Sequence, residues 1–289
     1  MREIFKKEFN NYFNSLTGYL AIGVFLFIAG YFLAVDNING KSVSFSQTVS
    51  DFSILLFIVP PFLTAGIMAD EKRIGMDRLY LSGNISTGKI IIAKFAAAFL
   101  PFLAGSAVLA FYPIILNAYG NVEMVRAYVA LGAFVLSGAA FSAIGLFIST
   151  CFKNKWLAMF LSYAVSFFFY HIYSLTENVS ADGKNGLVFI GLIILAFFTW
   201  VYFYSGNVLV SGVGLVAGGL TVAIVYLVKP DIYNGIISRI AFRLSVVERF
   251  YELEEGRFSL YSVCYIVSFT VLLLFLTVAK INRRRGGLQ

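Results

Sequence analysis

Long apolar stretches without acidic or basic residues dominate this chain. A helix needs about 20 residues, at 1.5 Å each, to cross a bilayer core of roughly 30 Å. Eight stretches come near that length, and Lys94 is the only Asp, Glu, Lys or Arg in them: 16–35, 52–69, 90–116, 127–150, 156–175, 187–204, 207–228 and 259–279. We therefore expect an all-α polytopic membrane protein, a helical bundle of eight transmembrane helices.

The number of spans has one alternative. Only Ser205 and Gly206 separate stretches 187–204 and 207–228, and residues 187–228 contain no charge. Such a segment is too long for one span, so a hairpin of two spans is favoured. A re-entrant hairpin would leave six transmembrane helices instead.

Composition agrees with a membrane protein. Hydrophobic residues make up 60% of the chain and charged residues only 13%, about half the charged share of a soluble domain. The net charge of +7 could suggest nucleic acid as a partner, but no soluble basic domain could carry that role. The excess of positive charge at the cytoplasmic ends of membrane spans explains it better.

The distribution of basic residues predicts the orientation. With the N-terminus in the cytoplasm, the inside segments are 1–15, 70–94, 151–155 and 280–289. They hold 14 of the 22 lysines and arginines and only five acidic residues. We expect both termini to be cytoplasmic, residues 281–289 forming a basic tail. Six or eight spans give the same result.

Residues 1–15 have a helical pattern. Aromatic side chains recur on one face, and Lys6 and Lys7 lie on the other. The residues of this stripe are Phe5, Phe9, Tyr12, Phe13 and Leu16. The pattern predicts an amphipathic helix in the cytoplasmic membrane interface. It serves either as a general membrane anchor or as a specific docking helix.

Two further segments have features that predict packing or amphipathicity. Residues 229–258 carry apolar residues at helical spacing, which predicts an extracytoplasmic amphipathic helix; they are Ile232, Ile236, Ile240, Leu244 and Val247. Gly214 and Gly218 form a G-x-x-x-G pattern, which lets helices approach closely. We expect these glycines to face a helix of the same chain rather than a second copy.

The sequence contains no motif of an ATPase or another enzyme. The stretch "GNISTGKI" (83–90) resembles a phosphate-binding loop, but Ile90 replaces the hydroxyl that would hold magnesium, and no buried strand precedes it. The chain has one histidine and two cysteines, without metal-ligand spacing. We expect no catalytic residue, metal or cofactor on this chain.

Three segments resemble one family of membrane proteins. "ADEKRIGMDRLYLSGNISTGKIIIAKFAAA" is similar to the first cytoplasmic loop of ABC-2 type transporter permeases, in particular their gliding-motility-type branch. The opening "IFKKEFNNYFNSLTGYL" and the closing "RLSVVERFYELEEGRFSLYSVCYIVSFTVLLLFLTVAKINRRR" are similar to the ends of the same branch. Positions of the loop that match are Glu71, Arg73, Gly75, Leu79, Leu81, Ile85, Ser86 and Lys94.

This resemblance implies a function. Residues 16–280 would form the transmembrane domain of a permease without ATPase activity, in the cytoplasmic membrane of a prokaryote. A separate nucleotide-binding subunit would hold ATP and magnesium, and a second permease copy or a sister permease would complete the complex. The loop 70–89 would couple to the ATPase through Glu71, Lys72, Arg73, Gly75, Arg78 and Leu79, and Phe5, Phe9 and Phe13 would belong to the interfacial helix. An extracytoplasmic accessory protein could join.

The cargo is not readable from the sequence, although aromatic-rich spans suit an amphiphilic substrate for export. Two other functions stay open. A gradient-driven secondary transporter would need acidic residues near the membrane midplane, and every Asp and Glu lies outside the apolar stretches. A non-transporting membrane scaffold of a surface complex would share the permease architecture.

Overall fold

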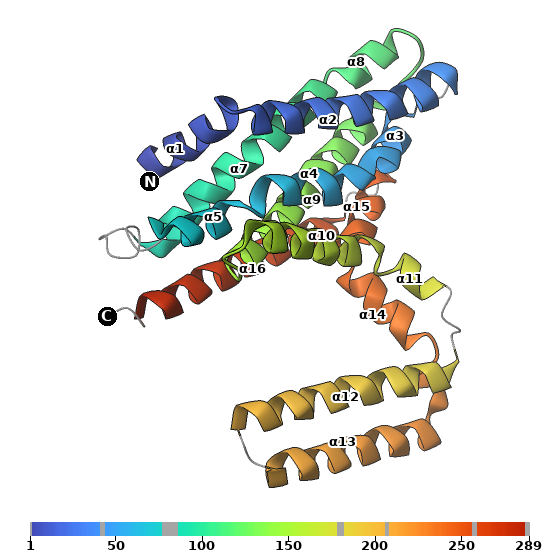
Figure 1. Cartoon of the computed structure of the whole chain (residues 1–289). Coiled ribbons are helices and arrows are strands. Elements are labelled where there is room, and N and C mark those ends of the chain that lie inside the picture. Colours follow the sequence, from blue (N-terminus) through green and yellow to red (C-terminus); the bar gives the residue numbers. More distant parts are fainter. Residues whose placement is uncertain are drawn as a thin grey trace. The chain divides into compact units, whose positions relative to one another are not determined.

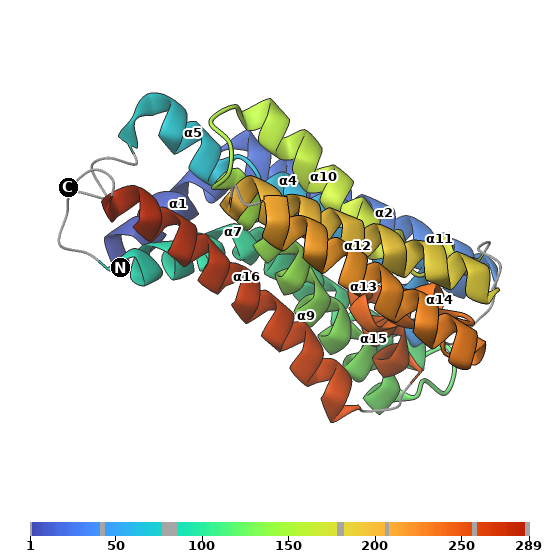
Figure 2. The ribbon, with the colours of Figure 1, turned by 90° about the horizontal axis from the view of Figure 1, so that it is seen from below.

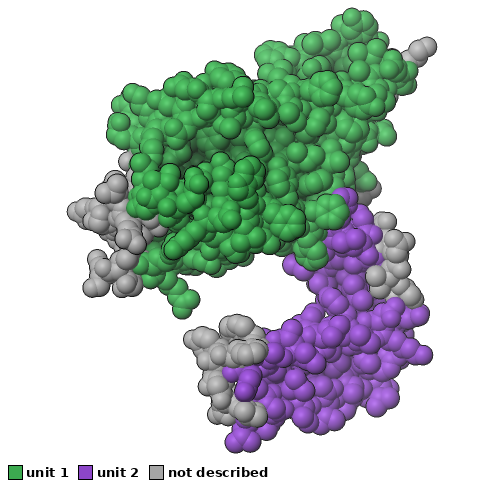
Figure 3. Space-filling model, viewed as in Figure 1, with its two compact units in different colours: residues 1–170, 246–289 green, residues 171–245 purple. Residues whose placement is uncertain are grey.

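The computed structural model describes residues 2–40, 44–76, 86–177, 182–205, 208–255 and 259–286, and every regular element in these ranges is a helix. The chain divides into two units, residues 1–170 with 246–289 and residues 171–245 (Figure 3). All-helical architecture therefore agrees with the expectation from the sequence.

The first unit contains most of the helices (Figure 1). Their bounds are α1 (Arg2–Phe13), α2 (Leu16–Leu33), η1 (Ala34–Asn39), α3 (Phe45–Asp51), η2 (Phe52–Ile54), α4 (Leu55–Thr64), α5 (Ile67–Ile74), α7 (Thr87–Leu109), α8 (Tyr112–Asn117), α9 (Met124–Ser149), α10 (Lys155–His171), α15 (Val246–Glu254) and α16 (Leu260–Gly286). In the second unit they are α11 (Ser174–Glu177), α12 (Gly183–Ser205), α13 (Val208–Val228), η3 (Pro230–Ile232) and α14 (Ile236–Leu244).

Six helical stretches in the described ranges are long and apolar enough to cross a membrane. They are Leu16–Asn39, Phe45–Ile74, Thr87–Asn117, Met124–Ser149, Ser211–Val228 and Leu260–Arg284. The chain is therefore a multi-pass membrane protein by helix length and composition. The predicted spans 156–175 and 187–204 correspond to α10, which has 17 residues, and to α12, whose apolar part is the shorter stretch Gly183–Thr199. The re-entrant alternative would also leave six spans, but it would exclude residues 187–228. The six stretches found here are a different set, because they include α13.

Helix α9 lies at the centre of the first unit. It packs against α4, α7, α15 and α16, and α16 runs beside it in Figures 1 and 2. Its fully buried Phe134 contacts a ring of aromatic side chains at centroid distances of 5.2–6.4 Å: Phe25, Phe52, Phe102 and Phe250. Four helices and η2 thus meet through this one phenyl ring, and their burial supplies the core.

The amphipathic helix expected over 229–258 is two helices, α14 and α15. Ser245 ends α14 in an extended conformation, and Gly235 precedes α14 with a positive φ of 64°. Both backbone conformations interrupt a helix. The apolar side chains divide accordingly, because Ile236 lies in α14 whereas Val247 is buried in α15. Residues 256–258 lie outside the described ranges.

The second unit is built on the hairpin of α12 and α13. A Cβ atom at Gly214 would lie 2.1 Å from the Phe198 ring, and one at Gly218 would lie 3.1 Å from Ile194. Both glycines of the G-x-x-x-G pattern therefore face α12 of the same chain, and their missing side chains let the two helices approach.

Candidate functional site

The site begins with Lys94, the one charged residue in an apolar stretch. It lies on α7 and exposes none of its side chain. Its Nζ donates hydrogen bonds to Glu8 Oε1 on α1, at 2.8 Å, and to Glu71 Oε1 on α5, at 2.6 Å. The side chains of Glu8 and Glu71 are only 8% and 9% exposed. We call these three residues the Lys94 cluster.

The charges of the Lys94 cluster explain its geometry. An isolated ammonium in an apolar interior is strongly unfavourable, so a buried lysine needs carboxylate partners. Lys7 Nζ lies 3.7 Å from Glu71 Oε1 and supplies a second cation. Two cations thus face two anions, and the Lys94 cluster together with Lys7 is formally neutral.

Helix α5 is also held from its other neighbours. Ser149 Oγ, at the end of α9, accepts hydrogen bonds from the backbone N–H groups of Met68 and Ala69 at 2.9 and 3.1 Å. Lys72 Nζ donates to the carbonyl of Thr150. These contacts satisfy amides at the start of α5, which would otherwise lack acceptors, and fix α5 to α9.

The predicted coupling residues divide into an inner and an outer group. Glu71 and Lys72 are buried, so their side chains contact this protein. Arg73 is exposed, and its Nη2 lies 3.9 Å from Asp70 Oδ1. Gly75 ends α5 with a φ of 78°, and its N–H donates to the carbonyl of Glu71. Arg78 and Leu79 lie outside the described residues.

The N-terminal segment forms α1, and its two faces differ. Ile4 is buried against Ile90 and Ala93 of α7, on the same side as Glu8. The predicted aromatic stripe is a stacked ladder, with Phe5 and Phe9 centroids 6.1 Å apart and Phe9 and Phe13 centroids 4.5 Å apart. These three rings are half-buried.

Tyr12 continues the buried side of α1. Its hydroxyl donates a hydrogen bond to the carbonyl of Leu63 on α4. Burial, and then the nearby charge of Glu8, raise the pKa of Tyr12 well above its usual range. The hydroxyl therefore remains protonated and able to donate.

Sequence reasoning missed Glu8, although two signals were present. Ile4, Glu8 and Tyr12 recur every four residues and so share one helix face. Lys94 stands alone in an apolar stretch, which requires a carboxylate from elsewhere in the chain. The sequence does not show which acidic residue supplies this carboxylate, because Glu8 lies 86 residues from Lys94.

The four segments predicted to lie inside the cell meet at one end of the first unit. Glu8, Glu71 and Lys94 join α1, α5 and α7. Lys155 Nζ pairs with Asp70 Oδ2 at 3.0 Å, and Lys280 Nζ lies 3.2 Å from Cys151 Sγ. Basic residues from all four segments thus share one end, as alternating spans require.

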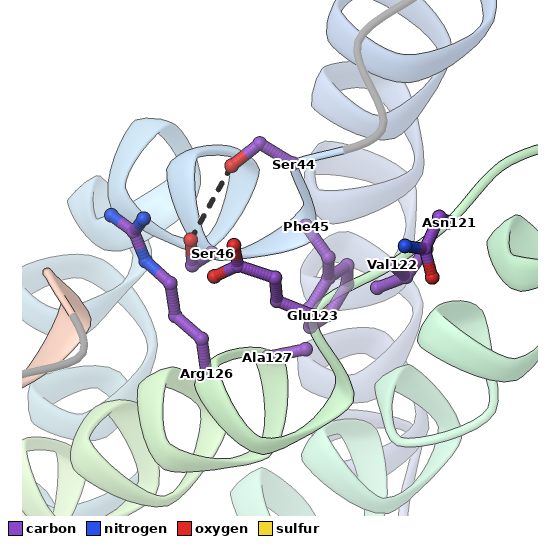
Figure 4. Close-up of a pocket in the computed structure, with 8 residues that line it drawn as sticks. All are labelled: Ser44, Phe45, Ser46, Asn121, Val122, Glu123, Arg126 and Ala127. Carbon is purple, nitrogen blue, oxygen red and sulfur yellow. Dashed lines mark hydrogen bonds between the residues drawn. The ribbon is translucent and has the colours of Figure 1, made fainter.

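A polar pocket of about 230 Å³ lies between α3 and the start of α9, away from the Lys94 cluster. In Figure 4, Glu123 and Arg126 lie beside Ser46, whose hydroxyl is 3.4 Å from that of Ser44. Arg126 Nε donates to the carbonyl of Glu254 at 3.2 Å. The hydroxyls of Ser44 and Ser46 thus contact each other, and the Arg126 side chain binds the backbone.

No model of a known protein family matches the chain, and no curated protein matches it. The likeness to ABC-2 type permeases therefore rests on the motifs themselves. Within the described residues, no group of three or more His, Cys, Asp or Glu side chains could hold a metal ion.

Proposed function

We propose that this chain is the permease subunit of an ABC-2 type exporter, of the gliding-motility-type branch. A separate nucleotide-binding subunit hydrolyses ATP with magnesium, and a second permease copy or a sister permease completes the pathway. The cargo is amphiphilic. The chain resides in the cytoplasmic membrane of a prokaryote with both termini in the cytoplasm.

The two faces of α5 carry this proposal. The inner face is fixed to α1, α7 and α9 through Glu71, Lys72 and Ser149. The outer face ends in exposed Arg73, Ile74 and Met76, and Ile74 is 69% exposed. A short helix that is rigidly tied to several spans, with an apolar and basic tip, suits the transmission of movement from a cytoplasmic partner to the membrane helices.

We also place α1 in the cytoplasmic membrane interface. Its phenyl ladder is half-buried, which suits a helix lying in the cytoplasmic membrane interface. Because α1 contacts α7 through Ile4 and Glu8, a movement of α5 would also reach α1.

We further propose eight spans, with α10, α12 and α13 among them. A 17-residue helix reaches about 26 Å, which a locally thinner bilayer accommodates. The test places a single cysteine at Asn207 in a chain without Cys151 and Cys264. Labelling from the cytoplasmic side supports a spanning hairpin; a site that is closed from both sides favours the re-entrant form.

The coupling proposal is tested with the tagged chain purified from its native membrane in mild detergent. We expect an ATP-hydrolysing subunit to co-purify in stoichiometric amounts. Ile74→Glu places an acid in the exposed tip without touching the Lys94 cluster, and should remove that subunit while the melting temperature is kept. Leu244→Glu, which also replaces an exposed aliphatic residue by glutamate but on α14, should retain the ATP-hydrolysing subunit.

Other outcomes point to the other functions. A chain that purifies alone from its native membrane and takes up substrate in liposomes under a proton or sodium gradient is a secondary transporter. ATP hydrolysis that responds to the permease without any movement of substrate indicates a scaffold. An ATPase subunit that stays bound to Ile74→Glu contradicts the assignment of the α5 tip.

A further inference from the structure

A cleft of about 550 Å³ lies beside the Lys94 cluster, between α1, the α4–α5 junction and the start of α10. All of its lining belongs to the first unit. One part of the lining is charged, with Lys7, Asp70, Glu71 and Lys155, and another part is apolar, with Phe62, Leu63, Trp156 and Met159. The cleft is therefore amphipathic.

One acceptor in this cleft has no partner among the described residues. Glu71 uses Oε1 for both Lys94 and Lys7, whereas Glu71 Oε2 is buried without a hydrogen bond. A buried carboxylate oxygen left unpaired is costly. A donor from a ligand in the cleft that Glu71 lines would satisfy this oxygen, and Asp70, 31% exposed, offers a second acceptor.

The same cleft is also lined by lysine side chains. Lys7 and Lys155 come from α1 and α10, and their side chains are 38% and 44% exposed. Each has an ion pair with an acidic residue of α5, so the lining offers both signs of charge within one small region. A ligand that complements it must itself carry an ammonium and an anion.

The apolar part adds the third requirement. Trp156 is 75% exposed, and Phe62 and Met159 are half-buried. An indole ring next to lysines is typical of the headgroup level of a membrane. The ligand must therefore have apolar chains that follow its charged end.

We propose that this cleft binds an aminophospholipid of the membrane, such as phosphatidylethanolamine. Its ammonium donates to Glu71 Oε2 and Asp70, its phosphate lies against Lys155 and Lys7, and its acyl chains follow Phe62, Met159 and Trp156. The inference does not depend on the ATPase partner, and it supplies a donor for the buried Glu71 Oε2 in the cleft that Glu71 lines.

The test uses fluorescence of Trp156 in the full chain carrying Trp200→Phe, which leaves Trp156 as its only tryptophan. The protein is reconstituted in vesicles of phosphatidylcholine that contain a minor share of one brominated lipid. Brominated phosphatidylethanolamine, phosphatidylcholine and phosphatidylglycerol are compared by the quenching of Trp156. Phosphatidylcholine has the same phosphate but no N–H donor, so it is the matched probe.

We expect brominated phosphatidylethanolamine to bind roughly tenfold more tightly than phosphatidylcholine, the factor of one charge-assisted hydrogen bond. Asp70→Asn and Glu71→Gln should each reduce that ratio severalfold while quenching by phosphatidylcholine is unchanged. Asp70 is partly exposed and outside the Lys94 cluster, so Asp70→Asn keeps the test valid should Glu71→Gln fail to fold.

Lys155→Met should weaken the quenching by both lipids because the phosphate loses a cation, whereas Lys153→Met, an exposed lysine outside the cleft, should have no effect. Equal quenching by all three lipids would mean non-specific lipid contact and overturn the proposal. Strongest quenching by phosphatidylglycerol would replace it with a simple anion site. Absence of quenching by every brominated lipid would show that no lipid enters the cleft and would also overturn the proposal.

Discussion

Lys94 and Glu71 are 23 residues apart in the chain, yet Lys94 Nζ lies 2.6 Å from Glu71 Oε1 in the interior. Glu8 Oε1 completes the cluster at 2.8 Å. One buried ammonium thus connects the N-terminal helix, the predicted coupling helix and the third apolar stretch. Both Glu71 and Lys94 belong to the segment that resembles ABC-2 type permeases.

Replacing Lys94 should destabilise the protein strongly. Lys94→Met leaves Glu8 and Glu71 buried without their central cation, a change that costs about 3–5 kcal/mol when one partner of a buried pair is removed. The measurement is thermal unfolding in detergent, followed by circular dichroism. Lys89→Met, at an exposed position of the same helix, is the control and should change little. Equal melting temperatures for both variants would contradict a structural role of the cluster.

The left-handed conformation of Gly75 predicts a selective effect of a side chain. A Cβ atom there meets nothing within 4 Å, so Gly75→Ala should cost about 1 kcal/mol through backbone strain alone. Hydrogen exchange of the amides in α5 would report the loosened end. Gly88→Ala, at an open helical position of α7, should instead be neutral or slightly stabilising. Equal hydrogen exchange and stability of the two variants would contradict backbone strain at position 75.

The hairpin of α12 and α13 should depend on Gly214. Cysteines at positions 194 and 218, in a chain without Cys151 and Cys264, should form a disulfide because these positions face each other. Gly214→Leu places a side chain against Phe198 and should slow cross-linking at least severalfold. Gly219→Leu has open space and should leave the rate unchanged; a slowing by both would point to a general effect on the helix.

Glu254 predicts a dependence of stability on pH. Burial raises its pKa above the ordinary value of 4.5, although the charge of Arg126 and a hydrogen bond with Ser46 oppose that shift. The folded protein therefore holds this proton more tightly than the unfolded chain. Its contribution is fully present below pH 4.5 and is lost as the pH rises through the raised pKa.

Melting temperatures of the wild type and Glu254→Gln, measured from pH 4.5 to 7, test this dependence. The variant should lose less stability over that interval because its amide does not titrate. Glu3→Gln, at an exposed position of α1, should follow the wild type. A Glu254→Gln variant with the same slope as the wild type would show that the carboxyl does not titrate in this window.

The sequence by itself determined the class of the protein, because apolar stretches near 20 residues have few folded states other than membrane helices. It also predicted which segments share one end, since basic residues mark it, and the structure brings Lys7, Lys94, Lys155 and Lys280 to that end. The helical period of residues 1–15 likewise predicted α1 and its phenyl ladder, because the period depends only on local spacing.

Only the tertiary structure decided how the charges pair and where the amphipathic outer segment breaks. A buried lysine requires a carboxylate, but nothing local selects Glu8 from a segment 86 residues away; packing of Ile4 against α7 brings it there. The break at Ser245 is equally non-local, because the apolar period of residues 229–258 continues across it while α14 and α15 pack in different units. Local spacing fixes which face of a helix is apolar, and three-dimensional packing fixes what that face meets.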